Sequence, residues 1–101
     1  MDNKILIILP TLNEAKNINI LFNEIKKLEI RFNYLFIDDN SSDGTRKYIV
    51  ELKKNYTNID YIFNDKRKGI GRAHKDGLLW AYKNNYDHVI TMDTDLAHHP
   101  K

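Results

Sequence analysis

Short apolar runs alternate along this chain with longer segments in which apolar residues recur every three or four positions. The runs have the length and the β-branched or aromatic character of strands and cover residues 5–9, 34–37, 59–63 and 88–92. The longer segments carry an apolar stripe typical of helices and cover residues 13–28, 45–55 and 68–84. The pattern predicts the order β-α-β-α-β-α-β.

This order predicts an α/β fold, a Rossmann-like parallel sheet with right-handed crossovers and helices on both faces. Pro10 is predicted to end the first strand, and the less regular third strand is predicted to lie near an edge. The stripes place their apolar residues inward. They are Ile18, Leu21, Phe22, Ile25 and Leu28 in the first helix, Tyr48, Ile49 and Leu52 in the second, and Ala73, Gly77, Leu78 and Ala81 in the third.

Composition narrows the class of protein. The 101 residues suffice for one small domain, and 42% hydrophobic with 30% charged residues is ordinary for a globular chain, which argues against disorder. The net charge of +2 is too balanced to indicate a nucleic-acid partner. With no cysteine, the chain has neither disulfides nor thiolate metal ligands, which fits a reducing compartment.

Membrane insertion is not expected. The longest apolar run, residues 5–9, is far shorter than the roughly 18–20 residues of a membrane span, and it lacks the features of a signal peptide. We therefore expect a cytoplasmic protein, with any contact peripheral, at the cytoplasmic face of a membrane.

Polar clusters follow three of the predicted strands: Asn13 and Glu14, Asp38 and Asp39, and Asp93 and Asp95. The carboxyl ends of parallel strands form the ligand crevice of such a sheet. We therefore expect these clusters to lie at one site.

Asp93 and Asp95 stand two positions apart after a strand, so both carboxylates can converge on one hard cation. The alternative is that these acids end the strand and cap a following helix. His98 and His99 are adjacent and have no third nitrogen or sulfur ligand nearby, so we interpret them as packing or hydrogen-bonding residues.

Asp38 and Asp39 should point to opposite faces of the sheet, so that only one of them enters the crevice. A carboxylate there can accept hydrogen bonds from a base or a ribose. Turn chemistry with Asn40 and Ser41 is the alternative, and residues 43–45 are interpreted as a turn and helix cap.

For two further loops, a purely structural role and a functional role both stay open. Thr11 or Asn13 could cap the first helix, and Glu14 suits its dipole with or without a function. The basic segment 66–74 could face a phosphate or form a solvated surface. It is not a dinucleotide fingerprint, because His74 stands where the third glycine belongs.

Together, residues 9–14, 36–45, 69–74 and 92–100 resemble the family 2 glycosyltransferases with the GT-A fold. They are most similar to the dolichyl- and polyprenyl-phosphate mannosyltransferase and glucosyltransferase group. The resemblance implies that residues 1–101 are the N-terminal nucleotide-sugar-binding part of an incomplete GT-A domain. It also implies that the fourth strand lies beside the first and leaves an edge and apolar surface exposed.

The resemblance implies a role for eight residues. Those expected to form the pocket for the donor's base and ribose are Pro10, Leu12, Glu14, Ile37 and Asp39. Those expected to meet the ribose, the diphosphate and its Mg or Mn ion are Asp93, Thr94 and Asp95, with Asp93 and Asp95 acting in catalysis through the metal. Two departures are Leu12, where the family commonly has Tyr, and Ala97, where some members place a further metal ligand.

The implied reaction transfers a hexose, mannose or glucose, from GDP-mannose or UDP-glucose to a polyprenyl (dolichyl) phosphate with inversion. The expected partners are the nucleotide-sugar donor and the lipid phosphate acceptor. We expect the isolated chain to be marginally stable, prone to self-association and catalytically inactive.

The alternative from another class is a truncated, non-catalytic nucleotide-binding module. A phospho-acceptor receiver domain would carry its acidic pair after the first strand, where Pro10 and Thr11 stand. A sugar nucleotidyltransferase would need a glycine-rich basic loop at that place, which the sequence lacks.

Overall fold

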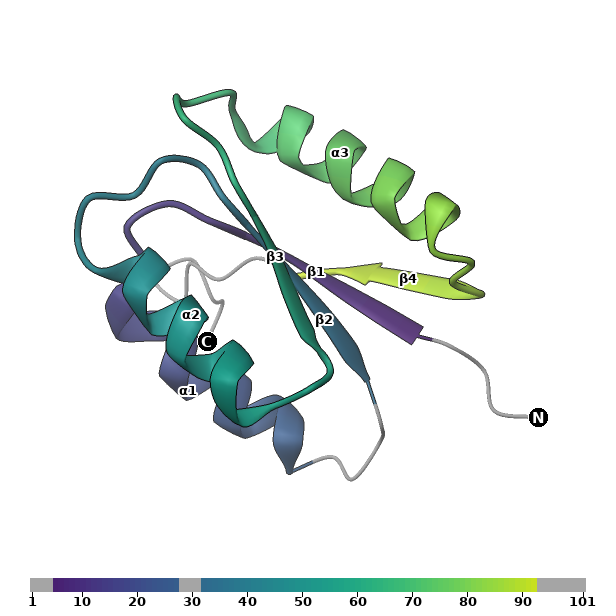
Figure 1. Ribbon diagram of the computed structural model, residues 1–101, viewed down its shortest axis with the longest axis horizontal. Helices are drawn as coiled ribbons and strands as arrows, with labels where there is room; N and C mark the ends of the chain where they lie inside the picture. Colours follow the sequence, from purple (N-terminus) through teal and green to yellow (C-terminus); the bar gives the residue numbers. More distant parts are fainter. Residues whose placement is uncertain (1–4, 28–31, 93–101) are drawn as a thin grey trace, which may run out of the picture.

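The computed structural model describes residues 5–27 and 32–92 and has an α/β fold (Figure 1). One sheet contains the strands in the order β3-β2-β1-β4, with bounds Ile5–Thr11 for β1, Asn33–Asp38 for β2, Ile59–Phe63 for β3 and His88–Thr91 for β4. The helices are α1 (Ala15–Lys26), α2 (Thr45–Asn55) and α3 (Ile70–Lys83). All neighbouring strands are parallel. The predicted element order and parallel sheet are confirmed, with β3 at an edge and β4 beside β1.

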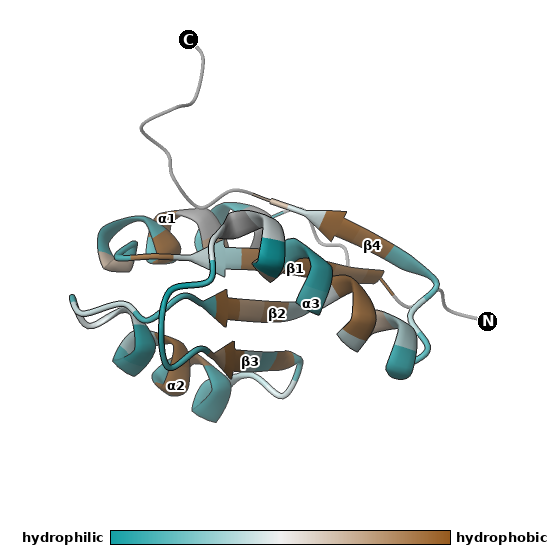
Figure 2. Ribbon diagram, turned by 90° about the horizontal axis from the view of Figure 1, so that it is seen from above, coloured by the Kyte–Doolittle hydropathy of each residue, from teal (hydrophilic) through white to brown (hydrophobic). Residues whose placement is uncertain are grey.

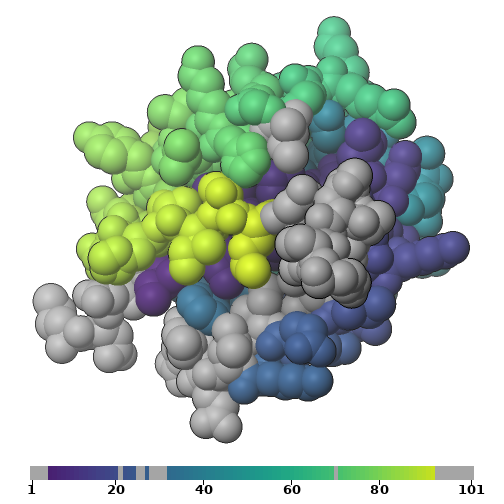
Figure 3. Space-filling view, turned by 180° about the vertical axis from the view of Figure 1, so that it is seen from behind, coloured from purple at the N-terminus to yellow at the C-terminus, as the bar shows by residue number. Residues whose placement is uncertain are grey.

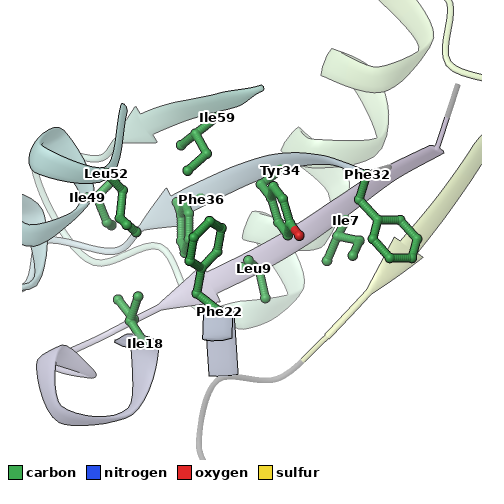
Figure 4. Close-up of a cluster of buried hydrophobic side chains, with 10 residues drawn as sticks. All are labelled: Ile7, Leu9, Ile18, Phe22, Phe32, Tyr34, Phe36, Ile49, Leu52 and Ile59. Atoms are coloured by element: carbon green, nitrogen blue, oxygen red, sulfur yellow. The ribbon is translucent and has the colours of Figure 1, made fainter. Parts of the chain in front are cut away.

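The helices cover both faces of the sheet, α1 and α2 on one side and α3 on the other (Figure 1). Successive strand residues point to opposite faces, so each strand contributes to two apolar clusters. The first lies between the sheet and α1 and α2 (Figure 4) and contains Ile7, Leu9, Ile18, Phe22, Phe32, Tyr34, Phe36, Ile49, Leu52 and Ile59. The second lies beneath α3 and contains Leu6, Ile8, Leu35, Ile37, Ala73 and Ala81. This double coverage explains why β1 and β2 read as uninterrupted apolar runs, and Figure 2 shows β2 largely in the hydrophobic colour.

Pro10 does not end β1, and that prediction is wrong. The strand continues to Thr11, and Pro10 is the register partner of Ile37 in β2. Backbone groups of alternate strand residues face the same neighbour, and the carbonyl oxygen of Ile8 accepts the N–H of Met92 at 3.0 Å. Pro10 therefore faces the β4 side, where the described pairing with β1 stops at Ile8. Its missing N–H removes no hydrogen bond between β1 and β2.

Among the side chains that the structure describes, the predicted helical faces are correct with one exception. Ala73, Gly77 and Ala81 are buried against the sheet, whereas Leu78 is 51% exposed and was wrongly placed inward. Each residue turns the helix by about 100°, so the position after Gly77 already leaves the narrow buried stripe. In α1, Ile18 and Phe22 are buried as predicted. Leu28 and the side chains of Leu21 and Ile25 lie outside the described part.

The edge at β4 reaches the molecular surface, where Figure 3 shows it in yellow below α3. Ile90 in this strand is 42% exposed. On the opposite side of the sheet from Ile90, the outer surface of α3 also exposes Leu79 and Tyr82. In the ranges 5–27 and 32–92, no helix has both the length and the apolar character that a bilayer crossing requires.

α3 packs closely on the sheet at Gly77, which gives a test of this packing. A Cβ at position 77 would lie 2.8 Å from Cδ1 of Ile8 and 3.0 Å from Cδ1 of Ile37, and both isoleucines are fully buried. We expect Gly77→Ala to destabilise the fold by about 1–2 kcal/mol, since overpacking exceeds the gain in helix propensity. Urea unfolding measures this change.

Gly71→Ala is the matched control, because a Cβ there meets nothing within 4 Å. This variant should be as stable as the wild type or slightly more stable. Equal stability of the two variants would contradict the close packing of α3 on the sheet.

Candidate functional site

The loops that follow β1, β2 and β3 lie together at the carboxyl ends of these strands (Figure 1). We call these loops, residues 12–14, 39–44 and 64–69, the rim. The ladder extends one step into it: the N–H of Asp39 donates to the carbonyl oxygen of Thr11, and the N–H of Asn64 donates to that of Asp38, both at 2.9 Å. The ends of the three strands are thereby held side by side.

Asp38 ends β2 with a fully buried carboxylate that accepts four hydrogen bonds. Its Oδ1 accepts from the hydroxyls of Thr11 at 2.7 Å and Ser41 at 2.6 Å. Its Oδ2 accepts from the N–H of Ser41 at 2.9 Å and Nε of Arg46 at 2.8 Å. Because this charge is both paired and saturated with hydrogen bonds, its role is to hold β1, the loop after β2 and α2 together.

Asp39 points the other way, toward the start of α3, as predicted for adjacent strand residues. Its Oδ1 accepts from the N–H of Lys68 at 2.8 Å and from Nδ2 of Asn64 at 3.2 Å, and its Oδ2 accepts from the N–H of Gly69 at 3.0 Å. Gly69 has φ of +91°, a conformation that favours glycine. The third rim loop therefore wraps around this carboxylate, whose negative charge suits the N-terminus of α3.

The hydrogen bonds of Asp39 change its ionisation. Burial raises the pKa of this carboxyl, but the N–H groups of Lys68 and Gly69, the Asn64 amide and the charge of Arg67 outweigh burial. The pKa of Asp39 is therefore below its usual value, and the group is an anion at neutral pH.

The basic loop presents its side chains outward, since Lys66, Arg67 and Lys68 are all exposed. The N–H groups of Lys68 and Gly69, which we considered for a phosphate, donate to Asp39 in this structure. These two N–H groups are therefore occupied by Asp39 and are not offered to a phosphate.

The first rim loop is tied to the second. The N–H of Asn13 donates to Oγ of Ser41, and Oδ1 of Asn13 accepts the N–H of Ser42, both at 2.8 Å. Asn13 has φ of +54°, a left-handed conformation that asparagine tolerates. Thr11 and Asn13 thus bind the loop after β2, and the start of α1 is satisfied by other residues.

Asp43 serves the starts of two helices. It accepts the N–H of Ala15, the first residue of α1, at 3.2 Å, and the N–H of Thr45, the first residue of α2, at 3.1 Å. Burial raises the pKa of Asp43, but the hydrogen bonds from the Thr45 hydroxyl and these N–H groups outweigh burial. The pKa of Asp43 therefore lies below its usual value. The prediction that residues 43–45 supply a turn and cap is confirmed.

Comparison with known proteins assigns this chain to a family. The sequence model described as glycosyl transferase family 2 matches residues 6–101. The chain belongs to this family.

Named relatives of this family 2 member include mannosyltransferases. An undecaprenyl-phosphate mannosyltransferase of Micrococcus luteus is 26% identical over 97% of this chain and 40% of its own length. A polyprenol monophosphomannose synthase of Mycolicibacterium smegmatis is 28% identical over 95% of this chain and 37% of its own. An uncharacterised protein of Methanocaldococcus jannaschii is 36% identical over 92% of this chain and 41% of its own. The chain thus spans about two fifths of these curated relatives.

Solved structures of the same architecture confirm the GT-A fold. The mannosyltransferase PcManGT from Pyrobaculum calidifontis, in complex with GDP-Man and Mn2+, superposes with a TM-score of 0.77 at 20% identity. The match covers 94% of this chain and 28% of that one. TarS 1–349 of S. aureus superposes with a TM-score of 0.73 at 28% identity, over 91% of this chain and 27% of that one.

The family 2 resemblance predicts donor contacts at five positions that the structure describes. Pro10 and Ile37 are register partners and buried, and the Ile37 side chain is 0% exposed beneath α3, so any ligand contact it makes is through its backbone. Leu12 is 37% exposed at the rim. Oε1 of Glu14 accepts from Nδ2 of Asn17 at 2.9 Å. Asp39 is held by the third rim loop, and the donor-binding role of all five stays a prediction.

The predicted metal segment, Asp93, Thr94 and Asp95, lies outside the described residues, as do His98 and His99. The described chain ends at Met92, hydrogen-bonded to Ile8 of β1. Within the described ranges 5–27 and 32–92, no three His, Asp or Glu side chains gather into a metal site. The carboxylates of Asp93 and Asp95 offer the oxygen ligands that Mg and Mn prefer, so they remain the candidate ligands.

The sequence interpretation missed two residues that support the site, Asn64 of the rim and Arg46 of α2. Asn64 follows β3 directly, and that position alone could have placed it beside Asp39. Arg46 lies in the first turn of α2, where a cation opposes the helix dipole, and such a placement signals a carboxylate partner nearby. The partner is Asp38.

The low pKa of Asp39 predicts how stability depends on pH. A carboxyl whose pKa is depressed on folding stabilises the protein above its unfolded value of 3.8, and this contribution is lost as pH falls through the lower folded value. We expect Asp39→Asn to cost about 1–3 kcal/mol at pH 7, and the difference from the wild type to shrink as pH falls below 3.8. Urea unfolding at a series of pH values measures it.

Asp65→Asn is the control, because Asp65 is an exposed carboxylate of the same loop. Its stability should follow the wild type at every pH. A cost of Asp39→Asn that stays constant down to pH 3 would show that the ionised carboxylate is not what holds the loop.

Proposed function

We propose that this chain is the donor-binding part of an inverting hexosyltransferase that uses a nucleotide sugar and a polyprenyl phosphate. The family match over residues 6–101 supports the reaction class. The names of two relatives, an undecaprenyl-phosphate mannosyltransferase and a polyprenol monophosphomannose synthase, favour mannose and a lipid phosphate acceptor. GDP-mannose is accordingly the preferred donor, with UDP-glucose as the second.

The observation that carries this proposal is the anionic carboxylate of Asp39, fixed at the carboxyl ends of parallel strands, where ligands bind in open α/β sheets. A carboxylate has about four acceptor positions, and three are used by Asn64, Lys68 and Gly69. One position remains for an N–H of the base or a hydroxyl of the ribose. Pro10, Leu12 and Glu14 border the same end of β1 and complete this part of the donor site.

The transfer itself requires charge stabilisation more than a protein base. The acceptor phosphate is already an anion and attacks the anomeric carbon, while the bond from that carbon to the diphosphate oxygen breaks and its electron pair leaves with the diphosphate. Asp93 and Asp95 would hold the Mg or Mn ion, with Thr94 between them. That ion would offset the charge gathering on the leaving diphosphate.

Nucleotide titration of the chain by calorimetry tests the proposal. We expect GDP to bind in the presence of Mn, and omission of Mn to weaken binding at least about tenfold, or 1.4 kcal/mol. Asp95→Ala should have the same effect as omission of the ion, because it removes a candidate ligand.

Asp87→Ala is the charge-matched control, since Asp87 is an exposed carboxylate before β4, at the end of the sheet opposite to the rim. Its affinity should equal that of the wild type. Equal GDP affinity with and without the ion would refute the metal-dependent donor site.

A further inference from the structure

We propose that Arg46 is a positioning residue of the donor site, which fixes the carboxylate of Asp39 through Asn64. The side chain of Arg46 lies on the α2 side of the sheet, whereas Asp39 points to the α3 side. The inference rests on the donor-binding role proposed above for Asp39. It assigns to a residue of α2 a task in a pocket that it does not touch.

The first step is the anchor of Arg46. Its Nε donates to Oδ2 of Asp38 at 2.8 Å, and the side chains are 30% and 0% exposed. Asp38 is itself held by Thr11 and Ser41 from two other segments. One nitrogen of the guanidinium group is therefore held in place at the end of β2.

The second step is the contact of Arg46 with the end of β3. Nη2 of Arg46 donates to the carbonyl oxygen of Asn64, and its Cζ lies 4.8 Å from the centre of the Phe63 ring. The N–H of Asn64 donates to the carbonyl oxygen of Asp38 at 2.9 Å. Both backbone polar groups of Asn64 are thus tied to the Asp38–Arg46 pair.

The third step leads from Asn64 to Asp39. Asn64 is 4% exposed, and its Nδ2 donates to Oδ1 of Asp39 at 3.2 Å, the atom that also accepts the N–H of Lys68. The backbone of Asn64 is held on both sides and its side chain is buried, which limits the freedom of its amide to leave this position. The chain Arg46–Asn64–Asp39 thereby links α2 with the start of α3 across β2 and β3.

The planar guanidinium is what makes this link possible. Two of its three nitrogens, Nε and Nη2, donate to Asp38 and Asn64 at once, whereas a lysine ammonium is a single centre on a flexible stem. A residue that only neutralised Asp38 would need the first contact alone. The second contact separates positioning from simple charge pairing.

The test uses Arg46→Lys, which keeps the charge beside Asp38, and Arg46→Met, which removes both contacts. Lys47→Met, at the exposed neighbouring position, is the control. NMR titration of the Asp39 carboxyl and the amide signals of Lys68 and Gly69 report on positioning, and GDP titration with Mn reports on the donor site.

For Arg46→Met we expect the pKa of Asp39 to rise toward its usual value, the two amide signals to shift, and GDP affinity to fall about threefold to tenfold, as for couplings through intermediate residues. Arg46→Lys should show an intermediate change in all three readouts. Lys47→Met should match the wild type.

Removal of Arg46 leaves Asp38 buried without its cation, so Arg46→Met could fail to fold. The double variant Asp38→Asn with Arg46→Met removes both charges and should show the same changes at Asp39. A folded variant whose Asp39 pKa and Lys68 and Gly69 signals match the wild type would overturn the inference, as would Arg46→Lys identical to wild type. If the wild type binds no nucleotide, the proposed function fails, while the NMR readouts still decide whether Arg46 positions Asp39.

Discussion

Four hydrogen bonds converge on the carboxylate of Asp38 at a point of the fold from which water is excluded. A buried charge is stable only when every acceptor position has a donor, so the donors must stay where they are. Those donors come from the end of β1, the loop after β2 and the first turn of α2. Satisfying this one group therefore holds the end of β1, the loop after β2 and α2 in place.

The rest of the sheet explains why the polar residues collect at its end. Both faces of β1 and β2 are covered by apolar side chains, and they leave no place for a functional polar group within the strands. Functional polar residues are therefore confined to the positions where strands pass into loops. Parallel strands bring these positions together at the same end of the sheet. The two adjacent aspartates at the end of β2 have different structural roles. Asp38 organises the α2 side, and Asp39 organises the start of α3.

Sequence periodicity predicted the elements well because β1 and β2 are apolar except at their ends and α2 has a regular apolar stripe. It failed at Pro10 because the cost of proline depends on which neighbour its nitrogen faces, and the register with β2 and β4 decides that. It failed at Leu78 because small residues let α3 lie close to the sheet, which narrows the buried stripe. The predicted strand ends correctly placed Asp39 in the rim. They could not reveal that Asn64 and Arg46 support it, because those contacts join residues far apart in the sequence.

One carboxylate, Asp43, is shared between the first N–H groups of α1 and α2, at distances of 3.2 and 3.1 Å. Such sharing fixes the number of residues in the turn between β2 and α2. An insertion there would move Asp43 away from α1 while it stayed bonded to α2. The starts of the two helices would then no longer share a hydrogen-bond acceptor. Natural variation in length should therefore be poorly tolerated in the turn between β2 and α2.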